Sequence, residues 1–186
     1  MDARELDRVA ARIRIVLMDV DGVLTDGTLW YLPDGQEMKA FHVRDGAGIR
    51  LAQEAGLMTG IISGRPSDVA SRRATELDLD EIHLDVADKN LVLDDILARR
   101  GLQPEEVCFI GDDIVDLRVL RRVGLAAAPA DAHPMVKIAA GFLCEADGGR
   151  GAVREVIDRI LSARKPQPQK PPPPEEKTPC APSSRS

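Results

Sequence analysis

The sequence predicts an α/β fold in which helices cover both faces of a parallel sheet. Short aliphatic runs rich in β-branched residues alternate with amphipathic helical stretches over residues 1–164. The 186 residues are 44% hydrophobic but only 3% aromatic, so the core must be aliphatic. Such near-continuous apolar runs are typical of strands buried on both faces, and the length suits a single domain.

Six aliphatic runs are expected to form the sheet. They lie at residues 13–18, 58–62, 81–84, 107–110, 125–128 and 142–144. A helical pattern follows each of the first five runs, and a further helix ends the domain. The expected helices cover residues 47–55, 67–77, 90–100, 114–122, 132–139 and 152–163.

Residues 28–43 interrupt this alternation and are expected to form a protruding β-hairpin. Residues 28–32 and 37–43 read as strands on either side of a turn at Pro33, Asp34 and Gly35. The segment contains the only Trp, the only Tyr and one of the three Phe. Aromatic side chains on a hairpin that projects into water favour self-association. The alternative is that the hairpin folds back as a lid on its own chain.

Residues 165–186 are expected to be a disordered tail outside the domain. They contain eight of the thirteen prolines and four basic against two acidic residues. Such a segment cannot bury enough apolar surface to fold alone. It is either a solvated extension or a ligand for a proline-recognition groove.

The charge balance and the cysteines exclude several classes of protein. Lys and Arg number 25 against 31 Asp and Glu, and this net charge of -6 argues against a nucleic-acid partner. No apolar run approaches the ~18 residues of a membrane span, and the first residues have no apolar signal core, so we expect a cytoplasmic protein without a membrane partner. Three cysteines without CxxC spacing indicate neither a disulfide framework nor a zinc site. Cys108 and Cys144 fall in expected strands and are interpreted as core residues.

Acidic and polar residues follow directly after several expected strands. These segments are residues 19–27, 63–65 and 111–116, and Lys89 opens the helix after the third strand. The carboxyl ends of parallel strands meet at one crevice, so these side chains should lie together. Carboxylates crowded at one spot need a cation, and hard oxygen ligands without His or Cys select magnesium over zinc. The sequence therefore predicts a magnesium site.

The same residues suit phosphoryl transfer. Bound magnesium screens an approaching phosphate from the carboxylates, so that one Asp can attack phosphorus. Lys89 and the Ser63 hydroxyl can hold the equatorial oxygens. In Asp19-Val20-Asp21 one carboxylate can attack while the other handles the proton. Each motif alone is common in solvated loops, and it is their joint occurrence at strand ends that favours a site.

Over residues 13–161 these motifs resemble the four motifs of the haloacid dehalogenase superfamily of phosphatases. The hairpin and residues 42–46, 111–117 and 148–155 are similar, more narrowly, to the 3-deoxy-D-manno-octulosonate 8-phosphate phosphatases. The resemblance implies a Rossmann-like body without a cap domain. It also implies a magnesium-dependent phosphomonoesterase of lipopolysaccharide biosynthesis that hydrolyses this sugar-acid phosphate.

The resemblance also implies roles for the acidic residues. Asp19 would form a phospho-aspartyl intermediate, and Asp21 would act as general acid and then as general base. Asp19, the backbone carbonyl of Asp21 and Asp112 would hold magnesium. Asp113 and Asp116 would lie in or behind the outer shell of the metal.

The remaining implied roles concern the substrate and the assembly. Ser63, Gly64 and Lys89 would bind the phosphoryl group. In a homotetramer the hairpins would pack at the centre, and neighbouring subunits would complete each pocket, with residues 148–151 reaching a neighbour's site. The candidates for binding the sugar acid are Arg65, Arg150 and Arg44.

The third motif, residues 85–90, departs from this pattern. It lacks the glycine expected a few residues before Lys89, so we expect its loop to have a different shape. A nine-carbon 9-phosphate of the neuraminate type is an alternative substrate. Two alternatives from other classes are a phospho-receiver domain, which the order of the motifs disfavours, and a non-catalytic scaffold that recruits partners through the proline-rich tail.

Overall fold

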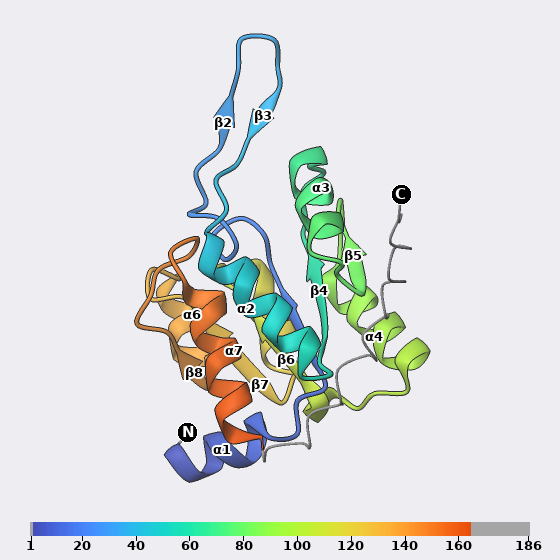
Figure 1. The fold of residues 1–186 in the computed structure, drawn as a ribbon, viewed down its shortest axis with the longest axis vertical. Helices are drawn as coiled ribbons and strands as arrows, with labels where there is room; N and C mark the ends of the chain where they lie inside the picture. The colour runs from blue at the N-terminus through green and yellow to red at the C-terminus, as the bar shows by residue number, and fades with distance from the viewer. Residues whose placement is uncertain (1, 165–186) are drawn as a thin grey trace, which may run out of the picture.

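The computed structural model describes residues 2–164 and contains a six-stranded sheet in which every neighbouring pair is parallel. The strands lie in the order β5-β4-β1-β6-β7-β8, so the first strand of the chain is central (Figure 1). The predicted α/β class is confirmed. The strand bounds are β1 Ile15–Met18, β4 Met58–Ile62, β5 Glu81–His83, β6 Val107–Ile110, β7 Leu125–Ala128 and β8 Phe142–Leu143.

Helices cover both faces of the sheet and form two aliphatic cores with it. One core joins the sheet to four helices, α1 (Ala3–Ala10), α2 (Val43–Glu54), α3 (Asp68–Glu76) and α7 (Ala152–Ala163). The other core joins it to α4 (Lys89–Arg100), α5 (Leu117–Leu120) and α6 (Pro134–Ala139). Two 3-10 helical turns flank β6: η1 (Pro104–Glu106) precedes it, and η2 (Ile114–Asp116) lies between it and α5.

Strand β1 shows why the runs in the sequence are continuously apolar. Val16 and Met18 point to the first core, and Ile15 and Leu17 point to the second. All four side chains are fully buried. Because successive strand residues face opposite sides, a strand between two helical layers needs apolar residues at every position.

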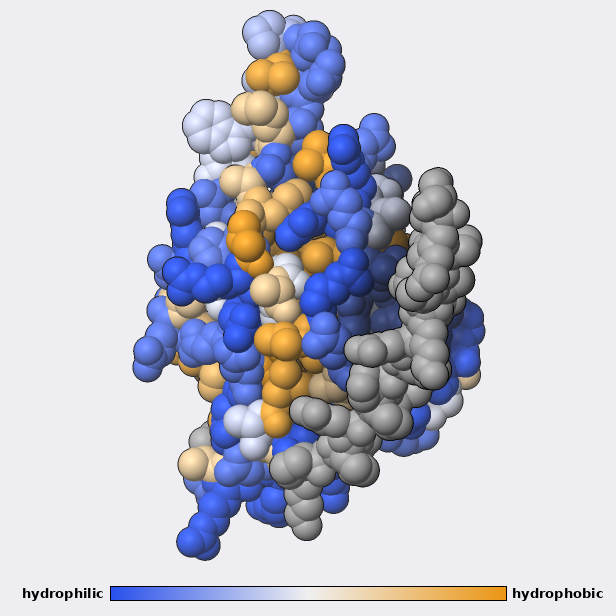
Figure 2. Space-filling view, viewed as in Figure 1, coloured by the Kyte–Doolittle hydropathy of each residue, from blue (hydrophilic) through white to orange (hydrophobic). Residues whose placement is uncertain are grey.

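Strands β2 (Trp30–Tyr31) and β3 (Glu37–Met38) pair antiparallel and form a separate two-stranded sheet. In Figure 1 this pair rises above the body at the end opposite α1. Both strands are shorter than the runs predicted from the sequence. Trp30 is 57% exposed and Tyr31 62% exposed, and Figure 2 shows apolar surface running from the hairpin down over the face below it.

Several boundaries differ from the predictions. Helix α1 was not predicted, because its sequence is polar and only Ala10 is buried. Helix α2 begins at Val43 rather than at residue 47, and the predicted helix at 114–122 consists of η2 and the short α5. Cys108 and Cys144 are buried, as predicted. The proline-rich tail lies outside the described residues, and none of the helices described is long and apolar enough to cross a membrane.

Candidate active site

A cavity of about 510 Å³ opens at the carboxyl ends of β1, β4 and β6, where the sheet order brings three loops and the start of α4 together. Most of the residues predicted from the motifs line it. They are Asp19, Asp21, Ser63, Gly64, Arg65, Lys89, Asp112 and Asp113.

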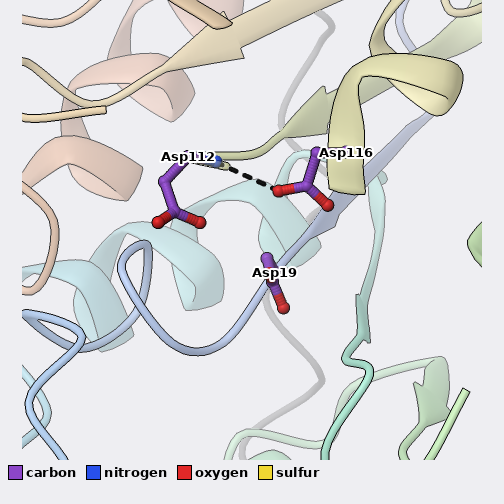
Figure 3. A group of neighbouring side chains, drawn as sticks. All are labelled: Asp19, Asp112 and Asp116. Atoms are coloured by element: carbon purple, nitrogen blue, oxygen red, sulfur yellow. Dashed lines mark hydrogen bonds between the residues drawn. The ribbon is translucent and has the colours of Figure 1, made fainter. Parts of the chain in front are cut away.

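Three carboxylates form an acidic cluster, called the acidic floor below: Asp19 and Asp112 line the cavity, and Asp116 lies fully buried beside them. Asp19, Asp112 and Asp116 each offer one oxygen, and these oxygens lie within 4.8 Å of one another (Figure 3). The Asp112 amide donates a hydrogen bond to Asp116 Oδ2 at 3.1 Å, drawn as the dashed line in Figure 3. Asp116 is fully buried and Asp19 is 8% exposed. Two strand-end loops thus converge on one acidic point.

Lys89 is the buried cation of this cluster. Its Nζ lies 2.8 Å from Asp19 Oδ2 and 2.7 Å from Asp116 Oδ1. Burial by itself would lower the pKa of Lys89, but the attraction of Asp19 and Asp116 outweighs burial and raises it. Lys89 therefore remains charged among the acids.

One lysine does not balance three carboxylates. Burial, with the repulsion of Asp116, raises the pKa of Asp19 to about 6, although Lys89 opposes the shift. Burial, with the charges of Asp19 and Asp116, raises the pKa of Asp112 to about 7. Burial and the neighbouring carboxylates thus outweigh the attraction of Lys89 at Asp112.

The residues present fit a magnesium ion. Asp112 Oδ1 is buried and has no hydrogen-bond partner within residues 2–164. Gly22, at φ +87°, makes room beside it, since a Cβ there would lie 2.1 Å from Asp112 Oδ2. An unpartnered carboxylate oxygen among hard oxygen donors is the arrangement that a magnesium ion completes.

Asp21 and Asp113 point elsewhere. Asp21 accepts a hydrogen bond from Lys39 Nζ, and its Oδ2 lies 3.8 Å from Arg65 Nε. Asp113 caps η2 by accepting a 2.7 Å hydrogen bond from the Ile114 amide. The carboxylate of Asp21 is therefore separate from the acidic floor, although its residue lines the same cavity.

The second and third motifs meet beside the floor. Ser63 is 3% exposed, and its carbonyl accepts a 3.1 Å hydrogen bond from the Val86 amide. At the third motif Asp85 adopts φ +56°, a left-handed conformation that normally favours glycine. Asp tolerates this conformation better than most residues, so the turn forms without the glycine and Lys89 still reaches Asp19.

The three predicted arginines lie in different surroundings. Arg65 lines the cavity, and its Nη2 lies 2.8 Å from the Tyr31 hydroxyl and 3.3 Å from Glu37. Arg150 is 68% exposed and lies 3.6 Å from Asp26, and Arg44 is exposed. Neither Arg150 nor Arg44 lines the cavity of its own chain.

Sequence reasoning missed four polar residues at this site. Asp88, Asn90 and Arg118 line the cavity, and Lys39 contacts Asp21 from the base of the hairpin. The alternation Glu37-Met38-Lys39 was a usable signal, because it places two charges on one side of an extended segment. Only the fold shows that this side faces Asp21.

The comparisons with known proteins agree with this geometry. Residues 81–157 match the haloacid dehalogenase-like hydrolase family. The 3-deoxy-D-manno-octulosonate 8-phosphate phosphatase of Escherichia coli strain K12 is 41% identical over 155 residues, which are 83% of this chain and 82% of that protein. Its counterpart from Yersinia pestis is 43% identical over 155 residues, 83% of each chain.

A solved structure shows the same fold. The Moraxella catarrhalis 3-deoxy-D-manno-octulosonate 8-phosphate phosphatase, in complex with a magnesium ion, a phosphate ion and a KDO molecule, has a TM-score of 0.86. It is 34% identical in sequence, and the match covers 88% of this chain and 94% of that chain. With identities above 40% over most of two curated relatives, the chain belongs to the haloacid dehalogenase-like hydrolases.

Proposed function

We propose that this chain is a magnesium-dependent phosphomonoesterase that hydrolyses 3-deoxy-D-manno-octulosonate 8-phosphate to the free sugar acid and phosphate. Two relatives more than 40% identical carry that activity in their names. The observation that carries the proposal is the buried Lys89 bridging Asp19 and Asp116 beside the unpartnered oxygen of Asp112. This arrangement suits an incoming anion that reacts at one carboxylate.

Asp19 is the proposed nucleophile. One of its oxygens attacks phosphorus, a phospho-aspartyl bond forms, and the bond from phosphorus to the sugar oxygen breaks. Lys89 and the Ser63 hydroxyl hold the charged oxygens of the phosphoryl group, with Gly64 beside them. The 2.8 Å contact between Lys89 and Asp19 supports this role, because the lysine is already at the reacting oxygen.

Asp21 is the proposed general acid and base. It gives its proton to the leaving sugar alkoxide, and then accepts a proton from the water that attacks the phospho-aspartyl group. Phosphate leaves and Asp19 is regenerated. The separation of Asp21 from the acidic floor supports this division of roles, since the two carboxylates of Asp19-Val20-Asp21 have different surroundings.

Asp19, the backbone carbonyl of Asp21 and Asp112 are the proposed magnesium ligands. When bound, magnesium supplies positive charge that offsets the carboxylates and the phosphoryl oxygens. Asp116 accepts a hydrogen bond from the Asp112 amide and so helps to orient that residue. Asp113 is proposed for the outer coordination shell of the metal. The raised pKa of Asp112 supports the need for this charge.

The sugar-acid end of the substrate needs a cation, and Arg65 is the proposed one within the chain. Its side chain is 38% exposed and lines the cavity, so it can meet a carboxylate that enters from solvent. Arg44 and Arg150 are proposed to act, with residues 148–151, at the site of a neighbouring subunit. Both side chains are exposed and neither lines the cavity of its own chain, which supports that assignment.

A homotetramer with the hairpins at its centre is the proposed assembly. The hairpin supports it through its exposed apolar side chains, which water solvates poorly. Light scattering tests the mass, and Trp30→Asp should yield a smaller species. The exposed apolar side chains of the hairpin are Leu29, Trp30, Tyr31, Leu32 and Met38.

A substrate panel tests the activity. The purified chain is assayed for phosphate release from the 8-phosphate and from a nine-carbon neuraminate-type 9-phosphate, each with and without magnesium. We expect repeated turnover of the 8-phosphate only with magnesium. Preference for the 9-phosphate would assign the other substrate, and one phosphate trapped per chain without turnover would indicate a receiver domain. Removal of residues 165–186 should leave the rate unchanged, because the proposed phosphatase domain is residues 1–164.

A further inference from the structure

Lys39 is a buried cation that the chemistry above does not use. It follows β3 at the base of the hairpin, and its side chain is 0% exposed. Its Nζ donates a hydrogen bond to Asp21 Oδ1 and lies 3.1 Å from Glu37 Oε1. A lysine is rarely buried this completely unless its ammonium group is paired, and here both partners are carboxylates.

Lys39 does not contact the space where an ester would bind. Asp21 and Arg65 line the cavity, whereas Lys39 does not. The ammonium group contacts the carboxylates of Asp21 and Glu37, and of these two residues only Asp21 lines the cavity, so the direct route from Lys39 to the reacting groups is through Asp21.

Glu37 holds Lys39 in place. The two residues point to the same side of an extended segment, and Glu37 also accepts a hydrogen bond from the Ser67 hydroxyl at the start of α3. Arg65 Nη2 lies 3.3 Å from the same Glu37 carboxylate. The lysine therefore sits between a carboxylate anchored to α3 and the carboxylate of Asp21.

The two oxygens of Asp21 have different partners. Oδ1 accepts a hydrogen bond from the Lys39 ammonium group and lies 3.5 Å from the Thr25 hydroxyl. Within residues 2–164, Oδ2 accepts no hydrogen bond, and Arg65 Nε lies 3.8 Å from it, which is too far for one. One oxygen is thus fixed and the other is available for a proton.

We propose that Lys39 is a positioning residue that fixes the Asp21 carboxyl group so that Oδ2 faces the leaving oxygen of the ester. The proposal rests on the proposed function, because it takes Asp21 as the group that moves the proton. Proton transfer requires the two oxygens to be within hydrogen-bond reach, and a displacement of about 1 Å can cost about 100-fold in rate.

The leaving group separates this role from a general structural one. A sugar alkoxide leaves poorly unless it receives a proton, whereas p-nitrophenolate leaves readily as the anion. Loss of Lys39 should therefore slow phosphorylation of Asp19 by the sugar phosphate but not by p-nitrophenyl phosphate. Both esters give the same phospho-aspartyl group, and its hydrolysis still needs Asp21 as a base.

The experiment compares the full-length wild type with Lys39→Met in rapid-mixing assays with magnesium. With the 8-phosphate, we expect kcat to fall about 100-fold at unchanged KM. With p-nitrophenyl phosphate, we expect p-nitrophenol to appear in a burst of one equivalent per site at the wild-type rate, followed by slow turnover. Lys39→Arg, which retains the charge, should restore most of kcat. Lys137→Met on α6, outside the cavity lining, is the matched control and should behave as wild type.

Two results would overturn the proposal. Equal slowing of phosphorylation by both esters would show that Lys39 acts through Asp19 or through the fold. A higher KM at normal kcat would show that Lys39 binds substrate. Since Met beside two carboxylates can disturb the hairpin base, Lys39→Gln is measured in parallel, and circular dichroism checks its folding. If the wild type does not turn over the 8-phosphate, the proposed substrate fails, and the Lys39 comparison is made with a primary alkyl phosphate that the wild type does hydrolyse.

Discussion

Glu81 is the buried acid whose contribution to stability can be worked out most directly. It lies on the edge strand β5, is 4% exposed, and its carboxylate contacts Arg99 at 2.8 Å, Arg100 at 2.7 Å and His83 at 2.9 Å. Burial alone would raise the pKa of Glu81, but the hydrogen bonds from Arg99, His83 and Arg100 hold it at about 2. Glu81→Gln keeps the volume of the side chain and removes the charge.

Proton linkage gives the direction in which the Glu81 charge changes the free energy of unfolding. The folded protein binds the Glu81 proton less tightly than the unfolded chain, so the ionised carboxylate stabilises the folded state above the ordinary pKa of 4.5. At ~1.4 kcal/mol per pKa unit, the lowering from 4.5 to about 2 corresponds to about 3 kcal/mol. Arg99 and Arg100 are 45% and 34% exposed, and solvent screens their attraction, so we expect a loss of about 2 kcal/mol at pH 7.

Urea unfolding followed by circular dichroism measures this loss. The difference between wild type and Glu81→Gln should be constant from pH 8 to pH 6. It should decrease below pH 5, and more than half of it should be lost at pH 3, as the pH approaches the folded pKa. Glu76→Gln is the matched control, since Glu76 pairs with exposed Arg72 on α3 and should lose less than about 0.5 kcal/mol. Equal losses for the two variants, or a difference independent of pH down to pH 3, would refute the reasoning.

Three further predictions concern the active site. Asp19→Asn should abolish steady-state phosphate release while leaving folding and assembly intact, because the nucleophile is lost at constant volume; measurable turnover would reject its role. Asp112→Ala should raise the magnesium concentration for half-maximal activity at least about 10-fold, and an unchanged metal titration would reject it as a ligand. Gly148→Ala should cost about 1–3 kcal/mol in urea unfolding and lower activity, because its Cβ would lie 1.9 Å from the Gly22 carbonyl oxygen; wild-type stability would show that the two loops separate freely.

The sequence predicted the parts of the fold that depend on local pattern. Strand β1 has apolar residues at every position, and this continuous run by itself identifies a strand buried between two layers of helices. Helix α1 offered no such pattern, because it is mostly polar: its start depends on the Asp2 cap, and only Leu6, Val9 and Ala10 pack against the core. At α2 the sequence Asp45-Gly46-Ala47-Gly48 lowers helix propensity, so the helix was predicted to begin too late.

The contacts of the candidate site likewise include some that could be predicted from the sequence and some that could not. The meeting of Asp19 with Asp112 could be predicted, because parallel strands place their carboxyl ends at one edge. The pairing of Lys39 with Asp21 could not be predicted, since it depends on the angle at which the hairpin leaves the body. The left-handed conformation of Asp85 could not be predicted either, because glycine adopts it far more readily than aspartate does.

The central position of β1 has a consequence for how the chain is made. Strand β1 pairs with β4 on one side and with β6 on the other, and roughly 45 residues separate these two partners along the chain. At ~5–20 residues per second, a ribosome needs about 2–9 s to synthesise that interval. Throughout it, the nascent chain has an apolar strand with one open edge. Strand β1, which leads directly into Asp19, is thus an apolar segment that needs shielding from aggregation during translation.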